Sequence, residues 1–235
     1  MVPPKVLVGC PTSDHKAYCL KEYVNALKAL TYDHFDVLLV DNSKTDEYSR
    51  NIKDLGIPVI KDTYLEHAKD RIVHSRNILR DYVLKHNYDY FLSLEQDVIP
   101  PPNIIEQLLH HDKPVVTGVY FKEYDIVDKD KVVAKKILPL LYRAQDIKKE
   151  HLFQLSEPYL KPNGLQPIDA CGLGCVLIHK TVLHDILFRH VKEHPPFDDM
   201  WFCHDALDQG FQLYVDMSVK CKHITKEMDW TTIKK

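Results

Sequence analysis

The chain has 235 residues, a formal net charge of −3 and 45% hydrophobic residues. This length suits one α/β domain, and the apolar content is sufficient for a full core. The near-neutral charge, without a long basic block, argues against nucleic acid as the main partner. No apolar run reaches the ~18 residues of a membrane-spanning helix, so we expect no transmembrane segment. The N-terminus lacks a signal-peptide pattern. We therefore expect a cytoplasmic protein, with a peripheral place on a membrane left open.

The six cysteines lie mostly in apolar surroundings, and no two of them have C-x-x-C spacing. This pattern predicts free, buried thiols in a reducing compartment. Cys171-x-x-x-Cys175 with Cys221-x-His223 is a weak zinc pattern, because the spacing is not that of a zinc knuckle.

The first half of the chain alternates short apolar runs with stretches of helical periodicity. We predict strands over residues 5–9, 35–40, 57–60, 90–94 and 115–121, and helices over residues 17–30, 70–86 and 102–111. Strands that alternate with helices indicate an α/β fold with a mainly parallel, doubly wound sheet.

The second half is less regular. Residues 122–136 are charged and lack periodicity, and residues 150–166 are polar and contain prolines, so both are predicted to be loops. We predict strands over residues 137–142, 175–178, 211–215 and 219–221, and helices over residues 180–190 and 199–209, the latter capped by Gly210. No repeat or linker interrupts the pattern, which predicts a single domain over residues 1–235.

Two carboxylates follow the apolar run at residues 90–94. Glu95 and Asp97 come directly after it, and three prolines at 100–102 end the strand. Their i, i+2 spacing directs both side chains to the same side of an extended segment. Open α/β sheets bind ligands at this end of their strands, and two hard oxygen ligands suit Mg²⁺ or Mn²⁺ holding a diphosphate. An acidic turn after a strand is the alternative interpretation.

Polar residues also follow the first two predicted strands. Asp41 could accept hydrogen bonds from a ribose or a base, and Thr12 could cap a pocket. Turn chemistry alone is the alternative explanation for both segments, because Asn42 and Ser43 are of residue types that favour turns.

Four further residues are candidates for the same site. Arg76 has the planar, permanently charged donor that suits a diphosphate, although a solvated helix cation is the alternative. Asp198 and Asp199 begin a predicted helix, where acids favour the helix dipole, and one of them could act as a general base. His223 follows the last strand and could complete a carboxylate-bound Mn²⁺ site, or be a simple loop residue.

These elements, in this order, resemble the GT-A glycosyltransferases, closest to the family-two-like branch that uses nucleotide-sugar donors. The resemblance covers residues 5–223. It rests on residues 8–12, residues 39–46, residues 75–77, Glu95-Gln96-Asp97 as the DxD-type motif, and residues 197–203 with Gly210 and His223.

The resemblance implies roles for individual residues. Residues 1–121 would form the nucleotide-binding half, and residues 122–235 the acceptor-side half. Donor-binding residues would be Pro11, Thr12, Asp41, Asn42, Ser43, Arg76, Asn77, Glu95 and Gln96. Metal ligands would be Asp97, His223 and Glu95, the last through water or replaced by contact with sugar hydroxyls. Asp199 would be the catalytic base, and the acceptor side would include Asp169, Gly172, Leu173, Gly174 and Asp198.

Three positions depart from the family pattern. Glu95 replaces an aspartate, Asp198 replaces a glutamate, and Trp201 stands where an acid is frequent. These departures make Asp199 a less direct assignment as base than Asp97 as metal ligand.

The resemblance thus implies an enzyme that depends on Mn²⁺ or Mg²⁺. It would move a hexose-type sugar from a UDP- or GDP-sugar to a hydroxyl of a glycan, lipid or protein, with inversion favoured. A retaining transferase and a non-catalytic nucleotide-sugar-binding module are alternatives. A nucleotidyltransferase is disfavoured, because residues 9–15 contain one glycine and no lysine.

Overall fold

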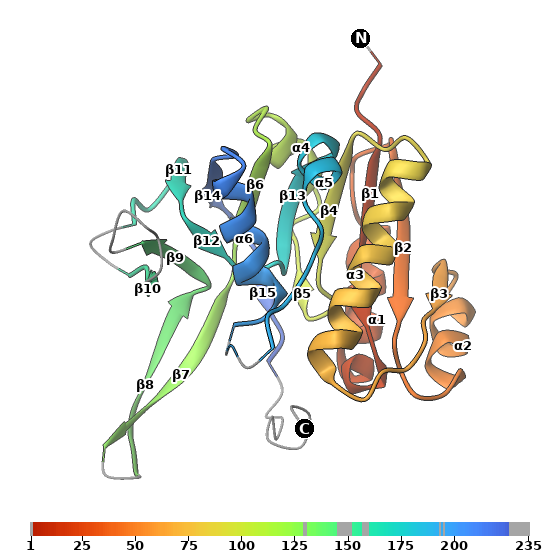
Figure 1. Cartoon of the computed structure of the whole chain (residues 1–235), viewed down its shortest axis with the longest axis horizontal. Helices are drawn as coiled ribbons and strands as arrows, with labels where there is room; N and C mark the ends of the chain where they lie inside the picture. Colours follow the sequence, from red (N-terminus) through yellow and green to blue (C-terminus); the bar gives the residue numbers. More distant parts are fainter. Residues whose placement is uncertain are drawn as a thin grey trace.

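The computed structural model describes residues 2–128, 131–144, 152–156, 160–192, 194 and 196–225. An eight-stranded sheet runs through the described part of the molecule (Figure 1). From one edge to the other it contains β11 (Leu165–Ile168), β14 (Leu213–Lys220), β6 (Val115–Val119), β13 (Cys175–His179), β4 (Tyr90–Leu94), β1 (Val6–Thr12), β2 (Phe35–Asp41) and β3 (Val59–Lys61).

The sheet is mixed rather than uniformly parallel. Strand β1 is parallel to β2 and β4, β2 is parallel to β3, and β14 is parallel to β6. Strand β13 runs antiparallel to both β4 and β6, and β11 runs antiparallel to β14. The predicted α/β fold is confirmed. The reversed strand β13 was not visible in the sequence, because an apolar run carries no information about strand direction.

Helices cover both faces of the sheet (Figure 1). On one face lie α3 (Ala68–Lys85), α5 (Lys180–Asp185) and α6 (Asp198–Asp208). On the other lie α1 (Leu20–Lys28), α2 (Glu47–Asp54) and α4 (Ile104–Leu109). Alternate side chains of one strand serve the two cores: in β1, Leu7 packs in the first and Val6 and Val8 in the second.

Three helical segments differ from the prediction. The helix predicted over residues 17–30 is a 3₁₀ turn, η1 (Asp14–Cys19), followed by α1. Helix α5 ends at Asp185, short of the predicted residue 190. Helix α2 was not predicted at all, because only Tyr48 and Ile52 supply large buried apolar side chains to an otherwise polar stretch.

The loop predicted over residues 122–136 is wrong. Strands β7 (Phe121–Asp128) and β8 (Lys131–Pro139) pair as an antiparallel hairpin that projects away from the main sheet (Figure 1). Most of β8 is exposed, including Val132, Val133 and Ile137. A hairpin with little buried surface has no need of alternating apolar residues, so its sequence lacks the usual strand signal.

A small second sheet contains β10 (Leu152–Gln154), β9 (Leu141–Ala144) and β12 (Ala170–Cys171). Strands β10 and β11 therefore correct the loop predicted over residues 150–166, of which 150, 151 and 157–159 lie outside the described residues. The strand predicted over residues 137–142 is divided between β8 and β9. The two strands predicted at 211–215 and 219–221 are one strand, β14, with an irregular register between Asp216 and Lys220.

Two other local predictions are confirmed. Gly210 follows α6 with a φ of 86°, the left-handed conformation that glycine adopts at a helix C-terminus. All six cysteines are free and buried. In the described residues, no helix combines the length and the apolar character needed to cross a bilayer.

Candidate functional site

A cleft of about 1050 Å³ opens where β1 and β4 end. Eleven of the residues predicted for the site line it: Pro11, Thr12, Asn42, Arg76, Glu95, Gln96, Asp97, Leu173, Asp198, Asp199 and His223. They come from both halves of the chain. The fold therefore brings the acidic motif, the start of α6 and the C-terminal histidine to one place, at the edge where open α/β sheets bind ligands.

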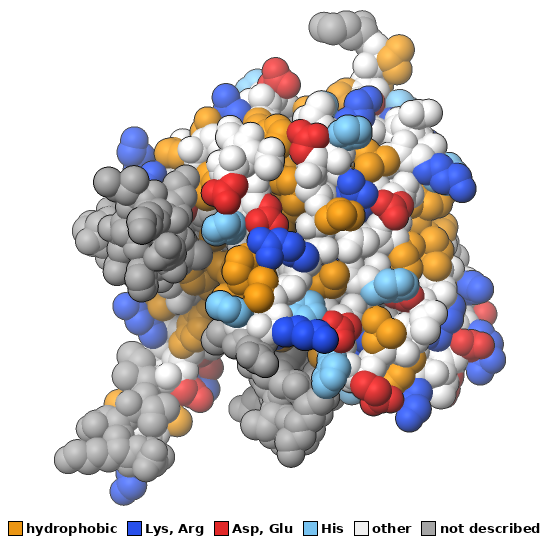
Figure 2. Space-filling view, in the orientation of Figure 1, with side chains coloured by type: hydrophobic (Ala, Val, Ile, Leu, Met, Phe, Trp, Pro, Cys, Tyr) orange, Lys and Arg blue, Asp and Glu red, His pale blue; other side chains and the backbone are white. Residues whose placement is uncertain are grey.

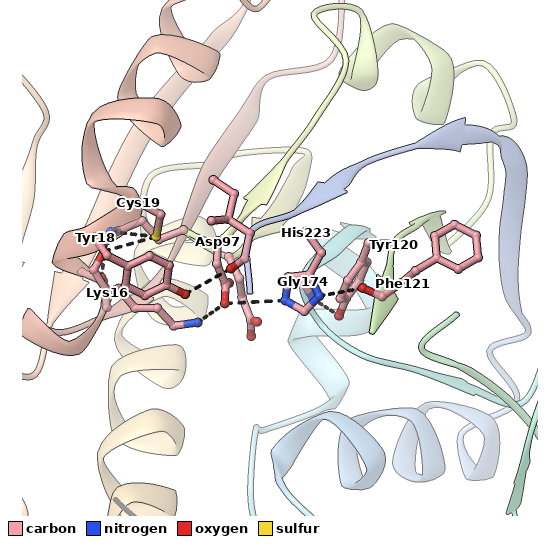
Figure 3. Close-up of polar contacts among 12 residues, drawn as sticks. Lys16, Tyr18, Cys19, Asp97, Tyr120, Phe121, Gly174 and His223 are labelled. Carbon is pink, nitrogen blue, oxygen red and sulfur yellow. Dashed lines mark hydrogen bonds and ion pairs between the residues drawn. The ribbon is translucent and has the colours of Figure 1, made fainter. Parts of the chain in front are cut away.

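Asp97 and His223 meet in this cleft (Figure 3). The short strand β15 (Lys222–His223) pairs with β5 (Val98–Ile99), and this pairing sets His223 opposite Val98. The His223 Nε2 atom lies 3.6 Å from an Asp97 carboxylate oxygen, Oδ2. On the other side of the ring, Nδ1 donates a hydrogen bond of 2.8 Å to the Phe121 carbonyl. Because a carbonyl can only accept, the proton on Nδ1 is fixed and Nε2 faces Asp97.

Asp97 is ionised, and one of its oxygens has no hydrogen-bond partner in the described part of the chain. Burial raises its pKa, but the neighbouring His223 imidazole and the Lys16 charge outweigh burial and bring the pKa to about 2. Lys16 forms an ion pair with Oδ2. The other oxygen, Oδ1, is buried and has no hydrogen-bond partner among the described residues. A buried carboxylate oxygen without a partner is costly, so Oδ1 is available to bind a cation or a water molecule.

The donor atoms of this pair fit Mn²⁺ or Mg²⁺. A carboxylate oxygen and an imidazole nitrogen suit Mn²⁺, and Mg²⁺ is commonly held by one or two protein ligands together with phosphates and water. Among the residues that the structure describes, no group of three His, Cys, Asp or Glu side chains could hold a metal ion. A metal at Asp97 and His223 would therefore take its remaining ligands from a bound molecule or from water.

Arg76 joins three parts of the site. Its buried guanidinium donates to Asp198 at 2.6 Å, to the Ser93 hydroxyl at 2.8 Å and to Glu95 at 3.2 Å. Helix α3, the end of β4 and the start of α6 are thereby held together. The contact with Arg76 also accounts for one Glu95 oxygen, and Glu95 does not join Asp97 and His223 in a three-ligand group.

The Asp199 carboxylate has a raised pKa. It is half-buried at the first turn of α6, where its carboxylate accepts a 2.8 Å hydrogen bond from the Met200 amide. Burial, and then the negative charge of Asp198, raise the Asp199 pKa to about 7. A carboxylate with this pKa can accept and release a proton near neutral pH.

Several predicted donor-binding residues bond to the protein itself. Asp41 accepts hydrogen bonds from Ser43 and Ser49, at 2.5 Å from each hydroxyl, and so fixes the turn after β2. Asn77 bonds to the backbone of Phe188 at 2.8 and 3.0 Å. Asp41, Ser43 and Asn77 are not among the residues that line the cleft.

The predicted acceptor-side residues divide in the same way. Leu173 lines the cleft, whereas Asp169, Gly172 and Gly174 do not. Asp169 accepts a 3.0 Å hydrogen bond from the Ala144 amide. The Gly174 amide donates to the Tyr120 hydroxyl at 3.0 Å, close against the Tyr120 ring.

Changing Gly174 to alanine should destabilise the protein by about 1–3 kcal/mol, the usual cost of overpacking a core. A Cβ at this position would lie 2.6 Å from the Tyr120 hydroxyl oxygen, and both residues are buried. Urea denaturation measures the loss. Gly118→Ala, whose nearest neighbouring atom would be 3.0 Å away, is the milder comparison and should cost less. Equal losses in the two variants would contradict this packing argument.

Sequence reasoning missed other residues of the cleft. Lys16 lies on η1, after the end of β1, and the sequence offers only its place behind a strand as a signal. Arg71 and Tyr120 also line the cleft, as do residues of the hairpin: Lys122, Glu123, Tyr124, Asp125 and Lys135. The hairpin residues were expected only as part of the acceptor-side half, residues 122–235, and none of them was singled out. On the face shown in Figure 2, positive and negative side chains are interspersed, which agrees with the near-neutral net charge.

Comparison with known proteins establishes the fold. No protein-family model matches this chain, and no curated protein matches it. A crystal structure of GalNAc-T7 with UDP, GalNAc and Mn²⁺ superposes with a TM-score of 0.65 at 12% sequence identity, and the match covers 95% of this chain and 44% of that one. A crystal structure of A197 from STIV gives a TM-score of 0.48 at 16% identity, covering 95% of this chain and 87% of that one. The likeness to GalNAc-T7 shows that this chain has a GT-A-like fold.

Proposed function

We propose that this protein is a metal-dependent glycosyltransferase that moves a sugar from a UDP- or GDP-sugar to a hydroxyl acceptor. One observation carries the proposal: an ionised Asp97 with an unpaired buried oxygen lies beside His223 Nε2, in a cleft where β1 and β4 end. The fold match supports it, and GalNAc-T7 was crystallised with UDP and Mn²⁺. UDP with Mn²⁺ is therefore the first combination to test.

Asp97 and His223 would hold Mn²⁺ or Mg²⁺. The bound cation would supply positive charge that neutralises the leaving diphosphate. Glu95 lines the cleft and is oriented by Arg76, so it would accept hydrogen bonds from hydroxyls of the donor sugar. Arg76 would act by keeping Glu95 and Asp198 in place, since it donates to both of them.

Asp199 would activate the acceptor. Its carboxylate would take the proton of the acceptor hydroxyl while that oxygen bonds to the anomeric carbon, and the bond from this carbon to the phosphate oxygen would break on the opposite face. The diphosphate leaves with the bonding electrons, and the configuration at the anomeric carbon inverts. Proton NMR of the product anomer distinguishes this route from retention.

The β7–β8 hairpin would shape the acceptor side of the cleft. The cleft is lined from this hairpin by Lys122, Tyr124 and Lys135. All three belong to residues 122–235, the predicted acceptor-side half. Basic and aromatic side chains together suit the polar edges and the apolar faces of a sugar ring. The acceptor hydroxyl, carried by a glycan, a lipid or a protein, would bind there.

A thermal-shift screen with UDP, GDP, CDP and ADP, each with Mn²⁺ or with EDTA, tests the proposal. A ligand that binds only the folded state raises the melting temperature by mass action. We expect either UDP or GDP to raise the melting temperature in the presence of Mn²⁺, and most of this rise to be lost in EDTA. Absence of a shift with all four would contradict the donor site while leaving the fold unchanged. Binding without sugar transfer or donor hydrolysis over a broad acceptor panel would instead indicate a non-catalytic module.

A further inference from the structure

The Lys16 ammonium lies beside Asp97, the carboxylate that would bind the metal ion of the proposed site. This ammonium forms an ion pair with Asp97 Oδ2 (Figure 3). The Lys16 side chain is only 23% exposed. His223 lies 3.6 Å from the same oxygen. Asp97 Oδ2 thus has both Lys16 and His223 beside it, while Oδ1 remains unpaired among the described residues.

The Lys16 backbone is fixed relative to Asp97. Its amide donates to the Ser13 carbonyl at 2.8 Å, and its carbonyl accepts a 2.6 Å hydrogen bond from the Gln96 side chain. Gln96 is itself held by hydrogen bonds from Thr12 at 2.6 Å and Tyr48 at 2.9 Å. Because Gln96 immediately precedes Asp97, this network ties the base of the Lys16 side chain to the acidic motif. The ion pair is therefore a built feature of the site rather than a chance surface contact.

An ammonium and a divalent cation repel each other when both are bound to the Asp97 carboxylate. An ion bound to the Asp97 carboxylate would lie within a few ångströms of the Lys16 nitrogen, where like charges repel strongly in a partly buried cleft. The flexible stem of lysine allows its ammonium to move away while the backbone stays fixed. Cleft-lining Lys16 would then face the space that a donor diphosphate occupies.

We propose that Lys16 is a built-in competitor of the divalent ion: it neutralises Asp97 in the metal-free protein and is displaced when the metal binds. This inference rests on the metal site of the proposed function. When the metal ion and the donor are bound, Lys16 would take a second position, in which its ammonium would lie beside the diphosphate. The unpaired Oδ1 and the Lys16 ion pair are the two observations that carry it.

Mn²⁺ binding to the protein, measured by electron paramagnetic resonance of the free ion, tests the competition without donor or acceptor. Lys16→Met removes the competing charge and should lower the Mn²⁺ dissociation constant about tenfold or more, within the usual range of coupling between sites. Lys16→Arg keeps the charge and should leave the constant near that of the wild type. Lys16→Gln is a second neutral variant, for use if the methionine variant does not fold.

Lys122→Met is the matched control, because Lys122 lines the same cleft but lies over the Tyr124 ring, at 5.4 Å from its centroid. It should change Mn²⁺ affinity little. Unchanged or weaker binding in the neutral Lys16 variants, or equal tightening in Lys122→Met, would overturn the inference. Tighter Mn²⁺ binding in a protein that transfers no sugar would uphold the inference and count against the proposed function, so the two can fail separately.

Discussion

Replacing Asp97 by asparagine should abolish the Mn²⁺-dependent stabilisation by a nucleoside diphosphate and reduce sugar transfer by at least about 10²–10³-fold, the loss typical when one electrostatic group of an active site is removed. Asparagine keeps the shape of the side chain but removes the charge and the anionic Oδ1 ligand. The measurements are thermal shift with and without Mn²⁺, and initial rates of donor turnover. Asp97→Ala should behave in the same way.

The same substitution should also reduce stability, for a separate reason. Lys16 forms an ion pair with Asp97, and without the carboxylate its positive charge loses a partner while its side chain is mostly buried. Breaking a fully buried ion pair costs about 3–5 kcal/mol, and partial exposure of Lys16 should reduce this to about 1–3 kcal/mol. Combining Asp97→Asn with Lys16→Met should restore part of the stability and none of the transfer.

Asp216→Asn is the matched control for Asp97→Asn. Asp216 is also buried and also pairs with a histidine, His111, at 2.6 Å, but it does not line the cleft. This variant should lose stability and keep its Mn²⁺-dependent response to nucleotide. An Asp97→Asn protein that still responds to nucleotide only in Mn²⁺ would remove Asp97 from the metal site.

The parts of the fold that bury apolar surface could be predicted from the sequence. Strands β1, β2, β4 and β6 are apolar runs, and α3 shows Leu79 and Val83 on one buried face. The β7–β8 hairpin could not be predicted, since backbone pairing holds it and most of β8 is exposed. Direction was hidden as well: β13 has the composition of any core strand and runs opposite to its neighbours.

Prediction of the candidate site from the sequence has a similar limit. The order of the motifs brought Asp97, Asp199 and His223 forward as candidates, and all three line one cleft. Which partner each polar group has is a matter of tertiary structure. Asp41 looked equally available in the sequence, yet its carboxylate is engaged by Ser43 and Ser49. Lys16 looked incidental, because its contact with Asp97 joins positions 81 residues apart.

Replacing Asp199 by asparagine should reduce kcat by about 10²–10⁴-fold, the contribution of a positioned general base. It should leave the Mn²⁺-dependent binding of nucleotide intact, because Asp199 is not part of the Asp97–His223 pair. In the wild type, kcat/KM should rise with pH and level off above about 7, the pKa of Asp199. This ascending limb should be absent from the residual activity of the variant. Retention of the limb would assign it to another group.

The raised pKa of Asp199 also predicts how this variant changes stability with pH. Between about pH 4 and 7 the folded protein keeps a proton on Asp199 that the unfolded chain has released, so the Asp199 contribution to stability falls as pH rises through this range. The asparagine side chain of the variant cannot ionise, so the variant should match the wild type near pH 4 and exceed it at pH 8. Since one pKa unit corresponds to about 1.4 kcal/mol and water reaches this half-buried group, we expect a gain of about 1–2 kcal/mol, or some 2–8 °C in melting temperature.

Asp205→Asn, on the same helix, should show the opposite dependence. Hydrogen bonds and charge from Arg189 and His204 outweigh burial and lower the Asp205 pKa, so its carboxylate stabilises the fold at neutral pH and loses this effect in acid. Asp205→Asn should therefore be less stable than the wild type at pH 8, with the difference shrinking as the pH falls. Opposite slopes of stability against pH in the two variants would show that folding disfavours the ionised form of Asp199. This is the expected cost of a carboxylate whose pKa lies near neutral pH. A flat slope for the Asp199 variant would mean that folding does not shift the Asp199 pKa, and a slope parallel to that of Asp205→Asn would mean that folding lowers it. In either case the assignment of a base would have to move elsewhere in the cleft.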